Sequence, residues 1–196
     1  MRAGSRAWAG LAALLCVLAL AARALPAEAI DWQPALALHQ PWRAFSSAAL
    51  HYSLMHLGAN LLGALFVGAL GVAADAPPRL AWAWLAAWPL TQFGLLMQPA
   101  LLHFGGLSGV LHAGTAVVAT HLLLAERGRR RAIGAAILGV VIVKVLSETP
   151  WGEPLRHPPQ WDIAVAPLAH ATGLVAGVFC AAVAQGIHHF RSAPRA

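Results

Sequence analysis

Charged side chains are scarce in this chain. Only 10% of its 196 residues are charged and 59% are hydrophobic, with a mean hydropathy of +0.66. Soluble domains carry about 25% charged residues, so an ordinary soluble domain is excluded. Apolar runs long enough to cross a ~30 Å hydrocarbon core recur along the chain and leave no room for a soluble domain between them. The sequence therefore predicts an all-α polytopic membrane protein.

Cysteines and acidic residues are also few. Cys16 and Cys180 both lie in apolar runs, which excludes a disulfide framework and a thiolate metal site. Lysine and arginine outnumber acidic residues by 13 to 7, but no amphipathic basic helix or aromatic platform accompanies them, so no nucleic-acid partner is expected. His51 and His56 are five apart without an intervening glutamate, which disfavours a metal transporter or metalloprotease. We therefore expect no metal site.

Hydropathy predicts six membrane spans in a single domain covering residues 1–196. With a cytoplasmic N-terminus, nine arginines lie on the inner side and three on the outer side, as the positive-inside rule requires. Residues 1–29 also fit a cleavable signal peptide, an alternative that leaves the later orientation unchanged. The predicted spans are 8–25, 47–71, 80–102, 108–125, 132–147 and 164–187.

A serine in a glycine frame stands where a polar loop leads into the fourth span. Ser108 is flanked by Gly105, Gly106 and Gly109, which permit a tight turn and close approach of a peptide backbone. A serine hydroxyl is a poor nucleophile until a base takes its proton, and His170 lies at a similar depth on the sixth span. We therefore predict that Ser108 is a nucleophile and His170 its base.

The second span carries polar residues at the same depth. His56 and Asn60 are four apart and share a helix face, and His51 is about one turn nearer the outer surface. Together with the Ser108 backbone N–H, His56 and Asn60 could donate hydrogen bonds to an oxyanion. The structural alternative is that these buried polar groups only bond one another. Their common depth favours a reaction site.

Small residues favour close packing of the fourth span on the sixth. Gly109, Ala113 and Gly114 form a small face on the fourth span, and Gly173 and Gly177 form a strip on the sixth. A helix pair that meets along these faces would bring His170 to Ser108.

No aspartate or glutamate lies near His170 in sequence to orient its imidazole, so the sequence indicates a Ser-His dyad and not a triad. Lys144 and Glu148 are spaced i,i+4 near the outer end of the fifth span, which favours a snorkelling pair over a proton relay. The loop 149–162 is rich in proline and tryptophan and could serve as a lid.

These motifs together resemble the rhomboid intramembrane serine proteases. The resemblance implies a six-helix rhomboid-like bundle with a water-filled cavity that opens outward, and no metal or cofactor. It also implies a Ser108 nucleophile, a His170 base, and oxyanion stabilisation by His56, Asn60 and the Ser108 N–H. The motifs are Trp42-Arg43, the HxxxxHxxxN pattern at His51, His56 and Asn60, the Gly-x-Ser-Gly motif at 106–109, and His170 with Gly173 and Gly177.

The short chain and the stretch 106–112 look like the rhombosortase branch, whose members are thought to process proteins with a C-terminal Gly-Gly sorting tail. Its substrates would be membrane-anchored proteins in a bacterial-type inner membrane, with the active site open to the periplasm. His112 occupies a position where rhomboids commonly have tyrosine, and either supports His170 or only packs there. The alternative to a protease is a catalytically inactive rhomboid-like binder or chaperone, which would be expected to lack Ser108 or His170.

Overall fold

The computed structural model describes residues 2–192, and the side chains of 2–187. Hydrogen bonding of the strand type is limited in this range to two isolated bridges, Trp32 with Phe104 and Arg156 with Val165. The long helices are α1 (Ala3–Ala21), α4 (Leu54–Ala73), α5 (Pro78–Phe93), α6 (Ser108–Ala125), α7 (Gly128–Ser147) and α8 (Pro167–Ser192); shorter elements are η1 (Ala22–Ala24), α2 (Ala27–Ile30), η2 (Pro34–Leu36), α3 (Arg43–Ala49) and η3 (Gly94–Met97).

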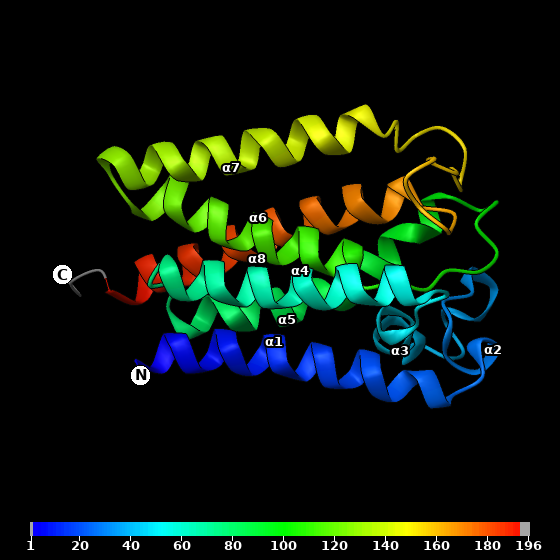
Figure 1. Ribbon diagram of the computed structural model, residues 1–196. Coiled ribbons are helices and arrows are strands. Elements are labelled where there is room, and N and C mark those ends of the chain that lie inside the picture. The colour runs from blue at the N-terminus through cyan, green and yellow to red at the C-terminus, as the bar shows by residue number, and fades with distance from the viewer. Residues whose placement is uncertain (1, 193–196) are drawn as a thin grey trace.

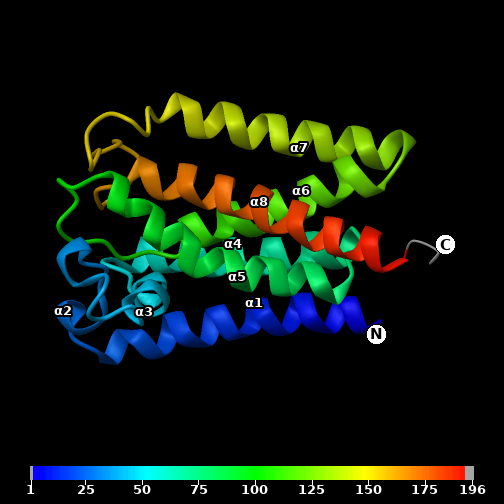
Figure 2. The ribbon, with the colours of Figure 1, turned by 180° about the vertical axis from the view of Figure 1, so that it is seen from behind.

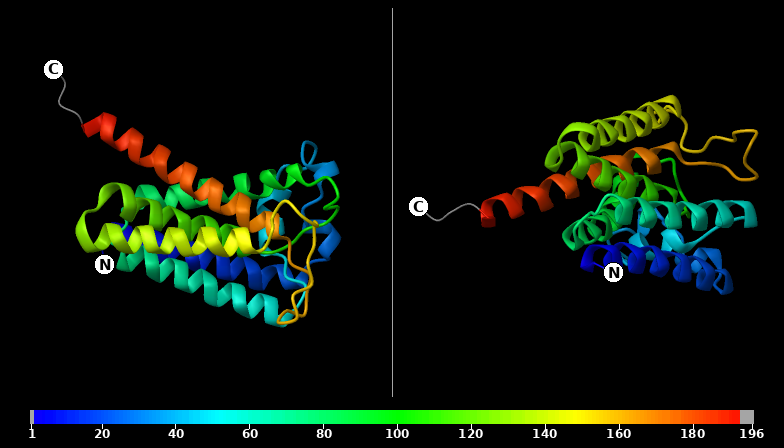
Figure 3. Two further views of the ribbon diagram at one scale, coloured as in Figure 1. Left: turned by 90° about the horizontal axis from the view of Figure 1, so that it is seen from above. Right: turned by 60° about the vertical axis from the view of Figure 1, so that its left-hand side comes forward.

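The long helices lie side by side in a bundle (Figure 1). The two ends of the chain lie at one end of the bundle, and α2, α3 and the longer connecting loops lie at the other, as the reverse view also shows (Figure 2). The last turns of α8 extend beyond the neighbouring helices (Figure 3). The predicted all-helical class is confirmed for the described residues.

Within residues 2–192, five helical segments are long and apolar enough to cross a membrane: Ala3–Ala24, Leu54–Ala73, Pro78–Met97, Ser108–Ala125 and Pro167–Ile187. The predicted fifth span corresponds to α7, which is 20 residues long. It does not join this set because three arginines in its first turn and Lys144 near its end make it too polar. The side-by-side packing of α7 with the other helices still places it in the bundle (Figure 1).

The second span differs from its prediction. The helix begins at Leu54 and not at residue 47, because the chain is extended at Leu50 after α3 ends. Ser53 caps α4, and its hydroxyl accepts a hydrogen bond from the His56 backbone N–H at 3.0 Å. Serine side chains compete with helical hydrogen bonding and favour such caps. His51 therefore lies in a connector and not on α4.

The third span is also shorter than predicted. Its helical part ends at Met97, and residues 98–107 form an irregular segment that leads to α6.

Helix α1 is an integral part of the bundle. Trp8 is fully buried and stacks on Trp84 of α5 with ring centroids 5.4 Å apart. The Trp84 indole N–H donates to the Val110 carbonyl on α6 at 2.8 Å, so its polar atom is satisfied inside the core. These contacts hold α1, α5 and α6 together.

Helices α6 and α8 form the most extensive contact in the fold. A Cβ atom at Gly109 would lie 2.6 Å from the Ala169 carbonyl oxygen, and one at Gly173 would overlap the Gly109 carbonyl. At Gly177 an added Cβ would overlap the Ala113 carbonyl. The predicted small-residue contact between these two helices is thus confirmed for Gly109, Ala113, Gly173 and Gly177, and it sets the position of the N-terminal turn of α8 against that of α6. The prediction that Gly114 shares this face is wrong, because an added Cβ there would meet Trp84 of α5 and Val67 of α4.

A buried ion pair fixes the loops at the same end. Asp31 is 2% exposed and accepts a hydrogen bond from Arg43 at 2.8 Å, while its second oxygen lies 2.6 Å from His103 Nδ1. Trp32 and Phe104 exchange backbone hydrogen bonds of 2.7 and 2.9 Å. These contacts join the loop after α1 to the segment before α6, and so restrain the glycine-rich approach to Ser108.

Candidate active site

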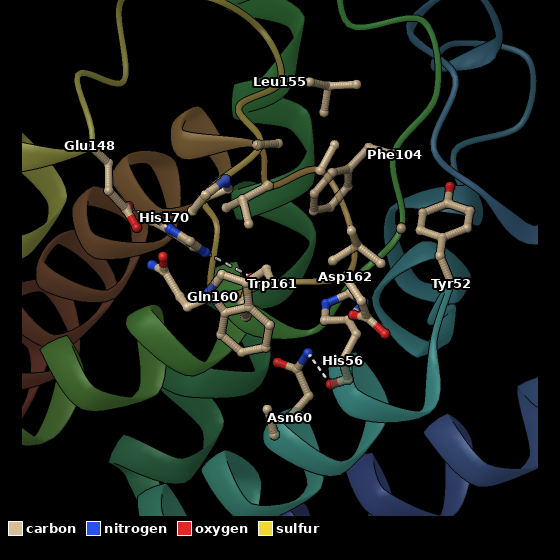
Figure 4. Close-up of a pocket in the computed structure, with 18 of the residues that line it drawn as sticks. Tyr52, His56, Asn60, Phe104, Glu148, Leu155, Gln160, Trp161, Asp162 and His170 are labelled. Carbon is tan, nitrogen blue, oxygen red and sulfur yellow. Dashed lines mark hydrogen bonds and ion pairs between the residues drawn. The ribbon is translucent and has the colours of Figure 1, made fainter.

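A cavity of about 770 Å³ lies at the loop end of the bundle (Figure 4). Its lining brings together predicted site residues from three helices: Ser108 and His112 of α6, His56 and Asn60 of α4, and His170 of α8. Much of the remaining wall comes from Lys144, Glu148 and the loop that follows them. Tyr52, Ala59 and residues 103–105 complete it, and the loop contributes Leu155, Pro158 and residues 160–166.

Ser108 is the first residue of α6, and its Oγ lies 2.9 Å from His170 Nε2. His170 stands in the first turn of α8 and is 5% exposed. Backbone N–H groups in the first turn of a helix have no partner within the helix, and the positive end of the helix dipole lies there. The Ser108 hydroxyl is therefore adjacent both to a base and to a site that favours negative charge.

His56 and Asn60 form the opposite wall of the cavity. Asn60 is 4% exposed and its Nδ2 donates to the His56 carbonyl oxygen at 3.0 Å. The His56 Nδ1 atom is buried and has no hydrogen-bond partner among the described residues. Figure 4 shows both side chains across the cavity from His170, with Trp161 between them in this view.

His51 does not line this cavity. Its Nδ1 lies 2.9 Å from the Ala49 carbonyl oxygen, and its ring centroid is 4.8 Å from that of His56. His51 therefore supports the His56 ring from the connector before α4.

Gly106 supports His56 from the other side. Its φ of +149° lies in a region that L-residues with a side chain rarely adopt, and an added Cβ would lie 3.0 Å from His56 Cε1. Its backbone N–H also donates to the Ser47 carbonyl at 2.9 Å.

We expect Gly106→Ala to lower the rate of any reaction at this site about tenfold or more, because the unfavourable φ costs ~1–3 kcal/mol and the new methyl group displaces the His56 ring. The measurement is the turnover rate of purified protein. Gly58→Ala on α4 is the matched control, since nothing lies within 4 Å of its added Cβ. Equal rates for the two variants would contradict this account of Gly106.

The prediction that no acidic residue orients His170 is wrong. Glu148 Oε2 lies 2.7 Å from His170 Nδ1, on the edge of the ring opposite Ser108. Burial raises the pKa of the Glu148 carboxyl, but hydrogen bonds and charge from His170 and Lys144 outweigh this effect and lower the pKa to about 2. Sequence reasoning missed this role of Glu148 because the residue stands 22 residues before His170, just after the end of α7.

The predicted pair of Lys144 and Glu148 is present, with Nζ 3.0 Å from Oε1. Lys144 Nζ also lies 2.9 Å from His112 Nε2 and 2.9 Å from His170 Nδ1, contacts that the spacing did not predict. His112 in turn stacks on the His170 ring with centroids 4.3 Å apart. Packing alone therefore does not describe His112, because its ring stacks on His170 and one of its nitrogens is hydrogen-bonded to Lys144.

Comparison with known families fits this arrangement. Residues 38–186 match the model of the family described as the rhomboid domain. The chain belongs to the rhomboid family. Membership supports intramembrane serine protease activity in general, with membrane proteins as substrates. No curated protein matches the chain.

The loop between α7 and α8 covers the cavity of this rhomboid protein. Asp162 accepts a hydrogen bond from the Ser53 hydroxyl at 2.8 Å, and Gln98 Nε2 donates to the Gly152 carbonyl at 3.1 Å. Arg156 and Val165 exchange two backbone hydrogen bonds of 2.8 Å, which fold the loop into a small hairpin. The loop is thus held at two points beside the cavity that it lines.

Proposed function

We propose that this rhomboid protein is an intramembrane serine endopeptidase with Ser108 as its nucleophile and His170 as its general base. The observation that carries the proposal is the 2.9 Å contact between Ser108 Oγ and His170 Nε2 inside a cavity large enough for a peptide segment. An inactive binder would not need a serine and a histidine in this geometry.

In the first step Ser108 Oγ attacks the carbonyl carbon of the substrate peptide bond, and His170 Nε2 accepts the hydroxyl proton. The tetrahedral intermediate collapses when the C–N bond breaks and His170 donates that proton to the leaving amine. Water then attacks the acyl-enzyme with His170 as base. The C–Oγ bond breaks, the proton returns to Ser108, and the new C-terminal carboxylate leaves.

The negative oxygen of each tetrahedral intermediate needs hydrogen-bond donors. The Ser108 backbone N–H at the start of α6, the Asn60 amide and the His56 ring line the same cavity and are suited to this role. Such preorganised donors typically contribute ~10²–10³ in rate each.

The substrates we propose are membrane-anchored proteins, and specifically proteins with C-terminal Gly-Gly sorting tails, as in rhombosortases. This proposal rests on the sequence Gly-Leu-Ser-Gly-Val-Leu-His at 106–112. The site would open to the periplasmic side of a bacterial inner membrane. The site lies at one end of the bundle, and the two chain ends and Arg129–Arg131 lie at the other (Figure 1). This arrangement agrees with an arginine-rich cytoplasmic side.

Co-expression with a reporter carrying a Gly-Gly tail tests the substrate. We expect a new reporter C-terminus within or beside the Gly-Gly sequence, identified by mass spectrometry. A control reporter with both glycines replaced by leucine should stay intact. An uncut Gly-Gly reporter would exclude the rhombosortase assignment and leave general protease activity untouched.

Labelling with a fluorophosphonate probe separates the protease from the inactive binder. We expect the probe to attach covalently to Ser108 of the native protein, located by peptide mass. Absence of label on native protein that remains folded would favour the inactive binder.

A further inference from the structure

Three polar side chains outside the serine and histidine pair meet in the same cavity: Glu148, Lys144 and His112. We infer that Glu148 is a positioning residue that holds His170 in the tautomer able to accept the Ser108 proton. Lys144 and His112 in turn hold the carboxylate in place. This inference rests on the proposed protease function and adds a positioning residue to the Ser108–His170 pair.

The hydrogen-bonding chemistry of Glu148 assigns the His170 tautomer. An ionised carboxylate can only accept, so the 2.7 Å contact requires His170 Nδ1 to carry the hydrogen. The neutral ring then has a lone pair on Nε2, which faces the Ser108 hydroxyl at 2.9 Å. This is the only neutral tautomer that can take the serine proton.

Lys144 competes for the same atom with the opposite effect. Its Nζ also lies 2.9 Å from His170 Nδ1, and an ammonium group can only donate. If Lys144 donated to Nδ1, the hydrogen of the neutral ring would stand on Nε2 and point at Ser108. His170 could not then act as a base. The choice between Glu148 and Lys144 at Nδ1 therefore decides whether the site is active.

The other contacts of Lys144 direct its protons away from Nδ1. It lies 3.0 and 3.1 Å from the two Glu148 oxygens and 2.9 Å from His112 Nε2. His112 Nδ1 lies 2.7 Å from the Ser108 carbonyl oxygen, which can only accept, so His112 donates through Nδ1 and accepts from Lys144 through Nε2.

The result is a closed ring of hydrogen bonds that begins and ends at Ser108. It runs from the Ser108 carbonyl through His112, Lys144, Glu148 and His170 to the Ser108 hydroxyl. When His170 takes the serine proton, the imidazolium faces a carboxylate already aligned with it. Charge of opposite sign at this distance stabilises the protonated ring in the transition state.

The decisive substitution is Glu148→Gln, which keeps the volume but lets an amide N–H or Lys144 donate to Nδ1. We expect kcat to fall ~10²–10⁴-fold with KM within about threefold of native, because the ring is held in the wrong tautomer. Glu148→Asp should have a kcat at least tenfold higher than that of Glu148→Gln, since aspartate restores an acceptor. Adding Lys144→Met to Glu148→Gln should also raise kcat, because it removes the competing donor.

Cleavage of a fluorogenic peptide and the Tm of detergent-purified protein are the measurements. Glu153→Gln, an exposed acidic residue in the following loop, is the matched control and should match native kcat. Native kcat in Glu148→Gln, or an Asp variant as impaired as the Gln variant, would overturn the inference. If Glu148→Gln does not fold, Glu148→Asp serves as the test of the inference. We then expect a lower kcat than native at unchanged KM, and a native kcat would overturn the inference.

The same assay separates this inference from the proposed function. If the native protein and Ser108→Ala are equally inactive on every substrate and neither labels with the probe, the protease proposal fails. If the native protein is active and Glu148→Gln equals it, only the role of Glu148 fails.

Discussion

Ser108→Ala is expected to reduce cleavage by on the order of 10⁴-fold or more and to abolish fluorophosphonate labelling. The substitution removes the hydroxyl that lies 2.9 Å from His170 Nε2, while the alanine methyl group fits the space of the hydroxyl-bearing carbon. His170→Ala should have an effect of the same order. The double variant should be no worse than either single variant, because the two groups act as a unit.

The control for this experiment is Ser147→Ala. Ser147 is exposed and its hydroxyl donates to the Lys144 carbonyl, so its loss leaves the cavity intact. We expect native cleavage and labelling in that variant, and an unchanged Tm in all of them. Substantial cleavage by folded Ser108→Ala protein would rule out Ser108 as the nucleophile.

Gly173→Ala is expected to move His170 away from Ser108. The added Cβ would overlap the Gly109 carbonyl, so α8 must move away from the backbone of α6. Overpacking of this kind costs ~1–3 kcal/mol, and a displacement near 1 Å between His170 and Ser108 reduces catalysis ~10²-fold. Both Tm and cleavage rate should therefore fall.

Gly186→Ala provides the comparison on the same helix, because nothing lies within 4 Å of its added Cβ. Alanine favours a helix over glycine by ~0.8–1.0 kcal/mol, so this variant should keep its activity and gain slightly in stability. If Gly173→Ala behaves as Gly186→Ala does, the close approach of α6 and α8 does not set the site geometry.

Short-range patterns made part of the site predictable. The glycines around Ser108 and the i,i+4 spacing of His56 and Asn60 are local features, and the depth of each residue follows from hydropathy and a rise of 1.5 Å per residue. The small-residue strips at Gly109 and Gly173 then indicated which helices meet. Each of these predictions needed only helix geometry and the cost of polar groups in a membrane.

Two features did not follow from hydropathy. The break before Leu54 depends on the Ser53 cap, because an apolar run does not show where a side chain replaces helical hydrogen bonds. The segment 98–107 leaves the helical pattern because Trp32 pairs with Phe104 through the backbone, a contact between distant parts of the chain.

The sequence by itself determined the helical membrane class, the serine in its glycine frame and the histidine that faces it, because periodicity and hydropathy act along the chain. Only the tertiary structure decided what lies behind that histidine. Glu148 and Lys144 reach His170 because α7 packs beside α6 and α8 and ends level with the first turn of α8. Side-chain contacts between helices depend on how the helices pack, and no spacing along one helix specifies them.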